Sequence, residues 1–385
     1  MKSLVSCSTA NVPAAMNLQY QAAVLHKART PLAIEQVNAT ALGASDVLVR
    51  VRAAGLCHTD LEVIDGSLRY PMPIVLGHEA AGVVEEVGAA VTAVRRGDHV
   101  ILSWNPHCGH CFYCDRGVPI LCEDYLAKGP QAVQFDGQNK AHLTHGGALK
   151  HVMFVGAFGD YCIVQDQQAI PVSKEIPFDR ACLIGCGVMT GVGAALNVAR
   201  IGPADVVMVI GCGAVGLSAV QGARLAGAAK IIAVDIDDAK LKLAQLMGAT
   251  CGVNASRDDA VVVGRKETFG RGVDTVIEAA GNAAAFRTTT EAVRPGGQIV
   301  WLGKIDVDKD VAFRWGSLMQ EKQIRRSSYG NARPARDFPL LARAYLDGRL
   351  MLDEMITQRI ELAAINDGFA ALRDGKAIRT VVTFA

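Results

Sequence analysis

The sequence predicts an α/β fold made of a doubly wound parallel sheet and a second, irregular β-rich domain. Three observations predict it. From about 188 to 328, continuous apolar runs such as "ADVVMVIG" and "KIIAVD" alternate with helical stretches such as "DAKLKLAQLMGA", as in parallel sheets whose strands are buried on both faces. From about 20 to 185, short β-like runs such as "AAGVVEEVG" and "DHVIL" are interrupted by Gly, Pro and Asp, which is typical of bulges and turns. The tail, "AAINDGFAALRDGKAIRTVVTF", predicts a helix and then a strand that returns to the β-rich domain.

These segments predict two domains, which suits a length of 385 residues at roughly 150 residues per domain. We expect the β-rich domain to be discontinuous, with residues 1–187 and 329–385, and to carry a cysteine-rich lobe at about 105–123. We expect the parallel-sheet domain at residues 188–328.

The composition is that of an ordinary globular protein. The net charge of +1, with 20% charged residues, gives no reason to expect a nucleic-acid or anionic-membrane partner. We see no run of about 20 apolar residues of the kind that predicts a membrane span, and the first twenty residues lack the apolar core of an export signal. The eleven cysteines are odd in number and several lie in apolar runs, which favours reduced thiols and a cytoplasmic protein.

The motif "VMVIGCGAVG" carries glycines at 211, 213 and 216, directly after a strand and at the start of a helix. Gly211 allows the tight turn, Gly213 lets a pyrophosphate approach the backbone, and Gly216 lets helix and strand pack closely. Asp235 ends the next strand, where a carboxylate can bind the ribose hydroxyls and repel a 2′-phosphate. The motif therefore predicts a Rossmann-type domain that prefers NAD to NADP. Lys240 either reaches the ribose edge or is a solvated helix lysine.

The stretch "CGHCFYCDRGVPILC" carries four cysteines, Cys108, Cys111, Cys114 and Cys122. Four thiolates on one short lobe can surround a single tetrahedral zinc with no position left for water, which predicts a structural site. Disulfides or an iron–sulfur cluster are the competing interpretations.

Two further turns, "GLCHTD" and "GHEAAG", supply Cys57 and His78, and "LIGCGVMTG" supplies Cys186 before the nucleotide domain. Together with the four-cysteine stretch, the glycine motif, Asp235 and "AIRTVVTF", these motifs occur in the order found in the zinc-dependent medium-chain alcohol dehydrogenases. The sequence resembles that family nearly end to end. The resemblance implies a GroES-like β-rich catalytic domain, reversible hydride transfer between an alcohol and NAD, two zinc ions per chain, and a homodimer or homotetramer.

The resemblance also implies roles for single residues. Cys57, His78 and Cys186 would hold a catalytic zinc with one open position, and Asp60 would accept the second N–H of His78. Thr59 would take the proton of the alcohol. Glu79 would lie behind the metal, or else form a buried salt bridge. Cofactor contacts are expected at His58, Thr190, Gly211, Gly213, Val215, Gly216, Asp235, Lys240 and Arg379.

Two positions depart from the better-known members. Glu62 stands where they have the histidine that ends the proton relay, so this carboxylate either accepts the proton or is a surface charge. His58 stands where they often have an arginine that contacts the pyrophosphate, which predicts a weaker and more pH-dependent contact. Arg379 matches the family's other pyrophosphate arginine.

By the same resemblance, the substrate channel is expected to be lined by Leu68, Trp104, Val152 and Met153. Such walls favour an apolar or aromatic primary alcohol. No arginine occupies the anion-binding position of the glutathione-dependent formaldehyde dehydrogenases, where Leu126 or Ala127 falls. Lys304 lies near the channel and could receive a polar or acidic tail.

The alternatives left open are a glutathione-dependent formaldehyde dehydrogenase, a polyol or secondary-alcohol dehydrogenase, and a zinc- and nucleotide-binding protein without turnover. Polyol-type relatives frequently replace the last zinc cysteine by glutamate, whereas Cys186 is retained. No catalytic position is lost, which disfavours the inactive protein.

Overall fold

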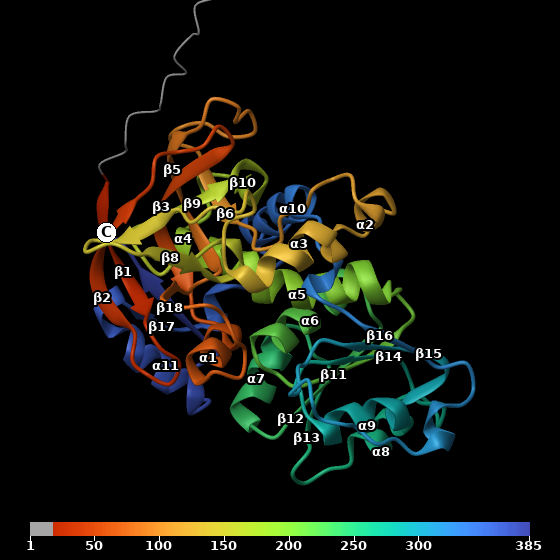
Figure 1. Cartoon of the computed structure of the whole chain (residues 1–385). Helices are drawn as coiled ribbons and strands as arrows, with labels where there is room; N and C mark the ends of the chain where they lie inside the picture. The colour runs from red at the N-terminus through yellow and green to blue at the C-terminus, as the bar shows by residue number, and fades with distance from the viewer. Residues whose placement is uncertain (1–17) are drawn as a thin grey trace, which may run out of the picture.

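The computed structural model describes residues 18–385. In Figure 1 the β-rich half and the parallel sheet lie side by side. Both parts of the predicted fold class are confirmed, because one half is built on a parallel sheet and the other on mostly antiparallel strands that include a small closed barrel.

The parallel sheet has six strands in the order β13-β12-β11-β14-β15-β16. Its strands are β11 (Val206–Ile210), β12 (Lys230–Asp235), β13 (Cys251–Asn254), β14 (Val273–Glu278), β15 (Val293–Trp301) and β16 (Gln323–Arg326). Its helices are α6 (Ala214–Leu225), α7 (Asp238–Leu246), α8 (Ala260–Glu267) and α9 (Ala283–Ala292).

Both faces of this sheet are covered. In β11, Val207 and Val209 belong to the apolar cluster that contains Leu217 of α6. Met208 belongs instead to a second cluster, with Ala285 of α9. Successive side chains of a strand point to opposite faces, which explains why the sequence shows continuous apolar runs rather than alternation.

The β-rich half contains a closed barrel, β1-β2-β7-β8-β4, and a sheet in the order β10-β6-β5-β3-β18-β17, with β9 also paired to β3. The bounds are β1 (Gln19–Leu25), β2 (Ala33–Ala39), β3 (Asp46–Gly55), β4 (Ile74–Val75), β5 (Glu79–Val87), β6 (His99–Leu102), β7 (Ala141–Leu143), β8 (Ala148–His151), β9 (Tyr161–Gln165), β10 (Ala169–Pro171), β17 (Ile356–Ile360) and β18 (Arg379–Thr383). The helices around them are α1 (His58–Asp65), α2 (Phe112–Asp115), α3 (Glu123–Lys128), α10 (Pro334–Leu346) and α11 (Ile365–Arg373).

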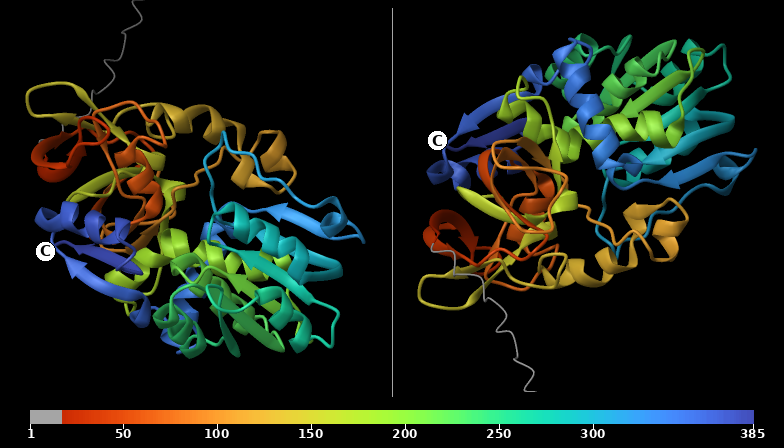
Figure 2. Two further views of the ribbon diagram at one scale, coloured as in Figure 1. Left: turned by 90° about the horizontal axis from the view of Figure 1, so that it is seen from below. Right: turned by 90° about the horizontal axis from the view of Figure 1, so that it is seen from above.

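The C-terminal strand returns to the first half of the chain. β18 pairs antiparallel with β3, with Val381 opposite Gly55, and the blue C-terminal segment lies beside the red and orange strands in both views of Figure 2. Register shifts between β3 and β5 at Leu48/Val49 are bulges of the kind that the irregular sequence pattern predicts.

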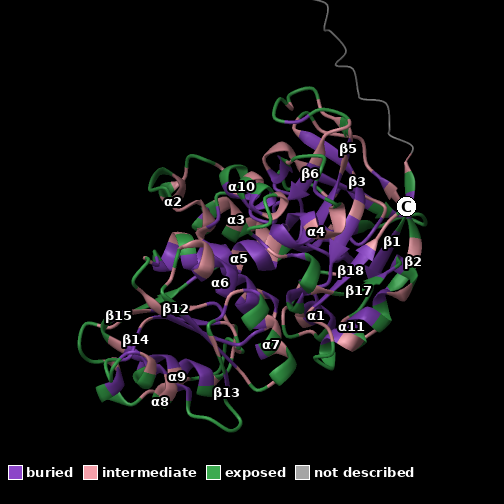
Figure 3. Cartoon of the chain, turned by 180° about the vertical axis from the view of Figure 1, so that it is seen from behind, coloured by how far each residue is buried: buried purple, intermediate pink, exposed green. Residues whose placement is uncertain are grey.

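A long helix joins the two halves. It runs continuously through α4 (Phe178–Leu183), a π-helical turn (Ile184–Val188), α5 (Met189–Gly193) and a second π-helical segment (Ala194–Ala199). By length and composition this helix is apolar enough to cross a membrane, but 78% of its most apolar window is buried inside the protein, as the purple of α5 indicates in Figure 3. The domain boundary expected at 187/188 falls inside it.

Candidate functional site

Three elements bring Cys57, His78 and Cys186 together. Cys57 is the N-cap of α1 directly after β3, and His78 directly precedes β5. Because β3 and β5 pair with Gly55 opposite Glu79, their two turns are neighbours. One ligand atom from each of Cys57, His78, Glu79 and Cys186 lies within 4.8 Å of the others.

Cys186 is carried by the π-helical turn of the long helix. Such turns leave backbone groups unpaired and occur frequently at functional sites. Here the Thr190 hydroxyl donates to the Cys186 carbonyl at 2.8 Å. The turn also packs tightly, since a Cβ on Gly187 would lie 2.1 Å from the Arg379 guanidinium. Only glycine allows this approach.

The donor set fits a zinc ion. His78 Nδ1 and Asp60 Oδ1 are 3.3 Å apart, and Asp60 also accepts the Gly77 N–H at 3.0 Å. This contact directs Nε2 of His78 toward the thiols, and among the described residues that buried nitrogen has no hydrogen-bond partner. A buried polar group without a partner is unfavourable. Two sulfurs and one imidazole nitrogen are ligands that zinc prefers.

Glu79 and Arg379 form a buried ion pair behind these ligands, with Nη2 and Oε1 3.2 Å apart. Burial raises the pKa of Glu79 to about 8, against the opposing effect of Arg379. Arg379 also donates to the Leu56 carbonyl at 3.2 Å. The ion pair matches one of the two interpretations of Glu79, while its carboxylate also lies within the ligand cluster. Arg379 is 3% exposed, and its contact with a pyrophosphate stays a prediction.

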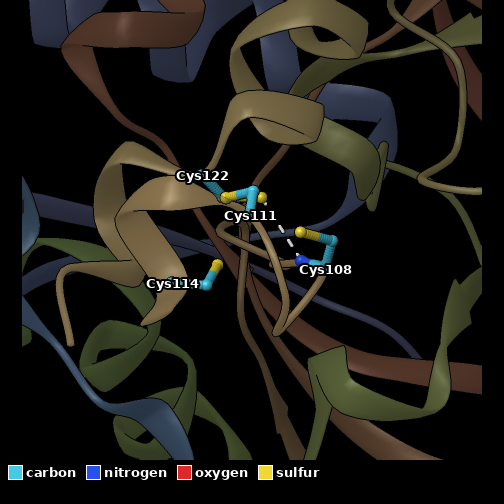
Figure 4. Close-up of side chains that lie close together, drawn as sticks. All are labelled: Cys108, Cys111, Cys114 and Cys122. Atoms are coloured by element: carbon cyan, nitrogen blue, oxygen red, sulfur yellow. Dashed lines mark hydrogen bonds between the residues drawn. The ribbon is translucent and has the colours of Figure 1, made fainter. Parts of the chain in front are cut away.

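The four cysteines of the lobe form a second cluster (Figure 4), again with ligand atoms within 4.8 Å of one another. The Cys108 N–H donates to Cys122 Sγ at 3.2 Å. The Glu123 N–H approaches Cys111 Sγ at 3.5 Å and is the main cause that lowers the pKa of the Cys111 thiol to about 6. All ten cysteines between residues 18 and 385 are free thiols, so the disulfide alternative finds no support there. Four converging sulfurs fit a closed tetrahedral zinc site.

The glycine motif lies at the carboxyl edge of the parallel sheet, where dinucleotides bind in such folds. Gly211 has φ of 92°, and a Cβ on it would lie 2.7 Å from the Ala280 nitrogen. A Cβ on Gly216 would lie 1.7 Å from the Gly211 carbonyl oxygen, whereas one on Gly213, the N-cap of α6, would meet nothing within 4 Å. Gly213 therefore leaves the approach to the helix N-terminus open.

Asp235 is tied to that motif by a contact that sequence reasoning missed. Its Oδ2 accepts the Cys212 N–H at 2.7 Å, and Oδ1 accepts the N–H groups of Ile236 and Asp237. The carboxylate thus has a structural role in orienting the glycine turn. A carboxylate offers about four acceptor sites, so a ribose hydroxyl can still bind.

Other expected cofactor residues line the seam between the halves. His58 is exposed. Partial desolvation of its imidazole by neighbouring residues lowers its pKa, and the positive charges of Arg379 and Lys240 lower it further. Lys240 lies on α7. The carbonyl of Val215 would be 2.2 Å from a Cβ on Gly191, so Val215 packs against the long helix.

The residues expected in the substrate channel belong to one apolar cluster, in which Trp104 and Val152 are buried and Leu68 and Met153 pack against them; their role as channel walls stays a prediction. The Trp104 ring centroid lies 4.1 Å from that of Tyr329, with the two planes tilted by 30°, and 6.3 Å from that of Tyr125. Val152 is fully buried, and Met153 follows it with φ of 49°. Leu68 lines a hollow with His26, Tyr70 and Met72 that none of the other three expected residues lines.

Two aromatic neighbours of the site were missed. Tyr329 is 2% exposed and its hydroxyl donates to the Gly185 carbonyl beside Cys186. Tyr125 belongs to the helix that follows the four-cysteine lobe. No local sequence signal marks Tyr329, because its partner lies 144 residues away.

Lys304, which the sequence placed only near the substrate channel, contacts two residues of α1. Its Nζ donates to Thr59 Oγ1 at 3.1 Å and to Glu62 Oε2 at 2.6 Å. It therefore joins both members of the expected proton relay across the seam between the halves.

Comparisons with known proteins agree with this geometry. Two family models match, "Alcohol dehydrogenase GroES-like domain" at residues 43–174 and "Zinc-binding dehydrogenase" at residues 214–346. The S-(hydroxymethyl)glutathione dehydrogenase of Saccharomyces cerevisiae is 36% identical over 94% of this chain and 95% of its own length. The NDMA-dependent alcohol dehydrogenase of Amycolatopsis methanolica is 37% identical over 95% and 99%.

Solved structures give the same result. An alcohol dehydrogenase zinc-binding domain protein from Burkholderia ambifaria superposes with a TM-score of 0.92 at 35% identity, over 96% of this chain and 99% of that one. Benzyl alcohol dehydrogenase from Acinetobacter calcoaceticus superposes with a TM-score of 0.90 at 29% identity, over 96% and 100%. With full-length relatives, both family models and two zinc-type donor clusters, the chain belongs to the zinc-dependent medium-chain alcohol dehydrogenase family.

Proposed function

We propose that this oxidoreductase interconverts a primary alcohol and its aldehyde with NAD at the site formed by Cys57, His78 and Cys186. Zinc and a nicotinamide dinucleotide are the cofactors of its family. The observation that carries the proposal is the cluster itself: three zinc-type ligand atoms within 4.8 Å, with a buried His78 nitrogen that lacks any other partner in the described chain.

When bound there, zinc supplies a Lewis acid for the substrate oxygen and the nicotinamide accepts hydride. The chain's own residues do the rest. Asp60 holds His78 in one orientation. Thr59 is buried two residues after Cys57, and its hydroxyl oxygen accepts a hydrogen bond from the alcohol O–H. The four-cysteine lobe keeps a separate, structural role, because all four of its positions are filled by sulfur.

We propose NAD rather than NADP because Asp235 is fixed at the end of β12 beside the glycine turn. A carboxylate held there repels a 2′-phosphate. A preference of at least about tenfold corresponds to ~1.4 kcal/mol, a modest value for one opposed charge.

For the substrate, the relatives favour S-(hydroxymethyl)glutathione over the apolar or aromatic alcohol expected from the sequence. Several full-length relatives with that activity in their names are 34–36% identical. That compound carries a primary hydroxyl on an adduct of formaldehyde and a thiol. We therefore propose it as the first candidate.

A second candidate, an aromatic primary alcohol, is favoured by the residues around the site. Trp104, Tyr125 and Tyr329 form an aromatic wall. Neither Leu126 nor Ala127, one of which falls where the glutathione branch has its arginine, carries a charge. The solved relative with benzyl alcohol dehydrogenase activity in its name agrees with this candidate.

The test is NADH formation by the zinc-loaded protein with two substrates, benzyl alcohol and a formaldehyde–glutathione mixture. We expect the higher kcat/KM with the mixture, and we expect it to fall when formaldehyde is given without glutathione. A higher kcat/KM with benzyl alcohol would select the second candidate. Absence of NADH with either, and with a panel of primary alcohols, would contradict the proposed function.

A further inference from the structure

We propose that Lys304 is a positioning residue of this enzyme: it crosses from the nucleotide-binding half to fix the Thr59 hydroxyl that faces the substrate. This inference rests on the proposed function. It assigns a role in the reaction to a residue of the other half of the molecule, 245 positions away from Thr59.

On α1, the ammonium of Lys304 contacts two defined side chains, those of Thr59 and Glu62. Thr59 and Glu62 are separated by three positions on this helix, so their side chains lie on the same face. The Lys304 ammonium donates to both, at 3.1 Å from Thr59 Oγ1 and 2.6 Å from Glu62 Oε2. An ammonium has three donors and no acceptor. It therefore occupies a lone pair of the Thr59 oxygen and is itself held by the Glu62 carboxylate.

The backbone of Lys304 is held rigidly on the other side of the seam. The N–H groups of Leu302 and Gly303 donate to the Glu278 carbonyl at the end of β14. A Cβ on Gly281, which has φ of 69°, would lie 2.5 Å from the Lys304 carbonyl oxygen. The buried Glu278 carboxylate in turn accepts the Gly281 N–H at 2.6 Å. The lysine thus reaches α1 from a fixed turn.

This arrangement orients the Thr59 hydroxyl. A hydroxyl has two lone pairs and one proton. With one lone pair taken by Lys304, the second lone pair and the proton remain for the side that carries Cys57 and the substrate. Hydrogen bonds from a charged donor are stronger than neutral ones, so the contact with Lys304 favours this orientation of the hydroxyl. Glu62, at the place of the usual relay histidine, serves to hold the lysine.

The test is a double-mutant cycle on kcat/KM for the preferred alcohol at saturating NAD. We expect K304M to lower kcat/KM by about tenfold, the size expected for losing one hydrogen bond to a charged group. In a T59A background, the same change should cost less than about twofold, because the group through which Lys304 acts is absent. K304R should restore part of the activity, and the exposed Lys309, changed to Met, serves as the matched control.

Two results would overturn the inference. One is an equal loss from K304M with and without Thr59. The other is a several-fold rise in the NAD dissociation constant of K304M in both backgrounds, which would make Lys304 a cofactor ligand.

A second measurement does not depend on turnover. In the cofactor-free protein, the thermal midpoints of K304M, E62Q and the double variant should be non-additive, with the double variant losing less than the sum. Additive midpoints would show that the contact between the two halves is absent and would overturn the inference. A wild-type protein that oxidises no alcohol would instead contradict the proposed function. The thermal midpoints of the variants would still show whether Lys304 and Glu62 are in contact.

Discussion

Cys186 and Cys111 belong to two differently built zinc sites, and their replacement should have different consequences. Cys186 lies on a helix whose most apolar window is 78% buried inside the protein, so Cys186→Ser should keep the fold, abolish turnover and leave about one zinc per chain. Cys111 lies in a lobe whose described elements are short helices of three to six residues, so we expect metal binding to contribute folding energy there. Cys111→Ser should therefore lower the soluble yield and the thermal midpoint.

Metal analysis by plasma emission, with activity and circular dichroism on the same samples, checks this prediction. The matched control is Cys251→Ser, since Cys251 is a partly exposed thiol of β13 outside both clusters. A fully active protein with one zinc per chain would contradict the assignment of two sites.

His151, at the end of β8, should make stability depend on pH. It is 3% exposed, its Nε2 accepts the Lys140 N–H at 3.2 Å, and burial together with nearby lysines lowers its pKa from 6.5 to about 4. Between these two pH values the unfolded chain binds more protons than the folded one, so the free energy of unfolding falls as the pH falls. The loss is complete below about pH 4 and amounts to roughly 3 kcal/mol.

The measurement is urea unfolding of wild type and His151→Gln, which keeps an acceptor but does not titrate. The difference in midpoint should shrink as the pH is lowered from 6.5 to 4 and stay constant above 6.5. A difference independent of pH would mean that His151 titrates normally.

At the scale of elements, alanine substitutions at two glycines of the nucleotide-binding turn should affect different properties: one should weaken NAD binding and the other should lower stability. Gly213→Ala adds a methyl where nothing of the protein lies within 4 Å, and φ of −72° suits alanine. The fold should persist while the NAD dissociation constant rises at least about tenfold, because the methyl occupies the approach to the N-terminus of α6. Gly216→Ala places a Cβ 1.7 Å from the Gly211 carbonyl oxygen, so the turn itself must move.

Calorimetric NAD titration and the thermal midpoint of each variant check this pair. Gly213→Ala should keep the wild-type midpoint, and Gly216→Ala should lose several degrees. Wild-type NAD affinity in Gly213→Ala would mean that the pyrophosphate does not approach this turn.

Sequence patterns predict the secondary-structure elements of this chain better than they predict its contacts between distant residues. The parallel strands could be predicted because each is a continuous apolar run between glycine turns. The long helix could not be delimited, because its apolar character comes from lying between the halves rather than from one amphipathic face. Contacts such as Lys304 with Thr59, or Tyr329 with Gly185, join positions 245 and 144 residues apart. Only the folded chain creates them, so only the resemblance to a family could place the ligands in advance.

At the scale of the whole molecule, the exposed edge of the parallel sheet predicts an association between two copies of the chain. Within residues 18–385, strand β16 has a neighbour on one side only, and its four residues are all exposed. An unpaired edge offers N–H and C=O groups to another chain unless charged side chains guard it. Here the guanidiniums of Arg325 and Arg326 donate instead to carbonyls of their own chain, at Val198 and Trp301.

Apolar side chains beside this edge support the same association. Trp315 and Met319, just before the strand, are 77% and 51% exposed, and Ile324 within it is 38% exposed. We therefore expect a homodimer that joins two β16 strands, with a mass by light scattering of twice the 40.7 kDa of one chain. Ile324→Lys should shift this mass toward the monomer, because two lysines would face each other across the symmetric interface. The control is Leu340→Lys, at a 61% exposed leucine on α10. An unchanged mass in the Ile324 variant would place the contact between copies elsewhere.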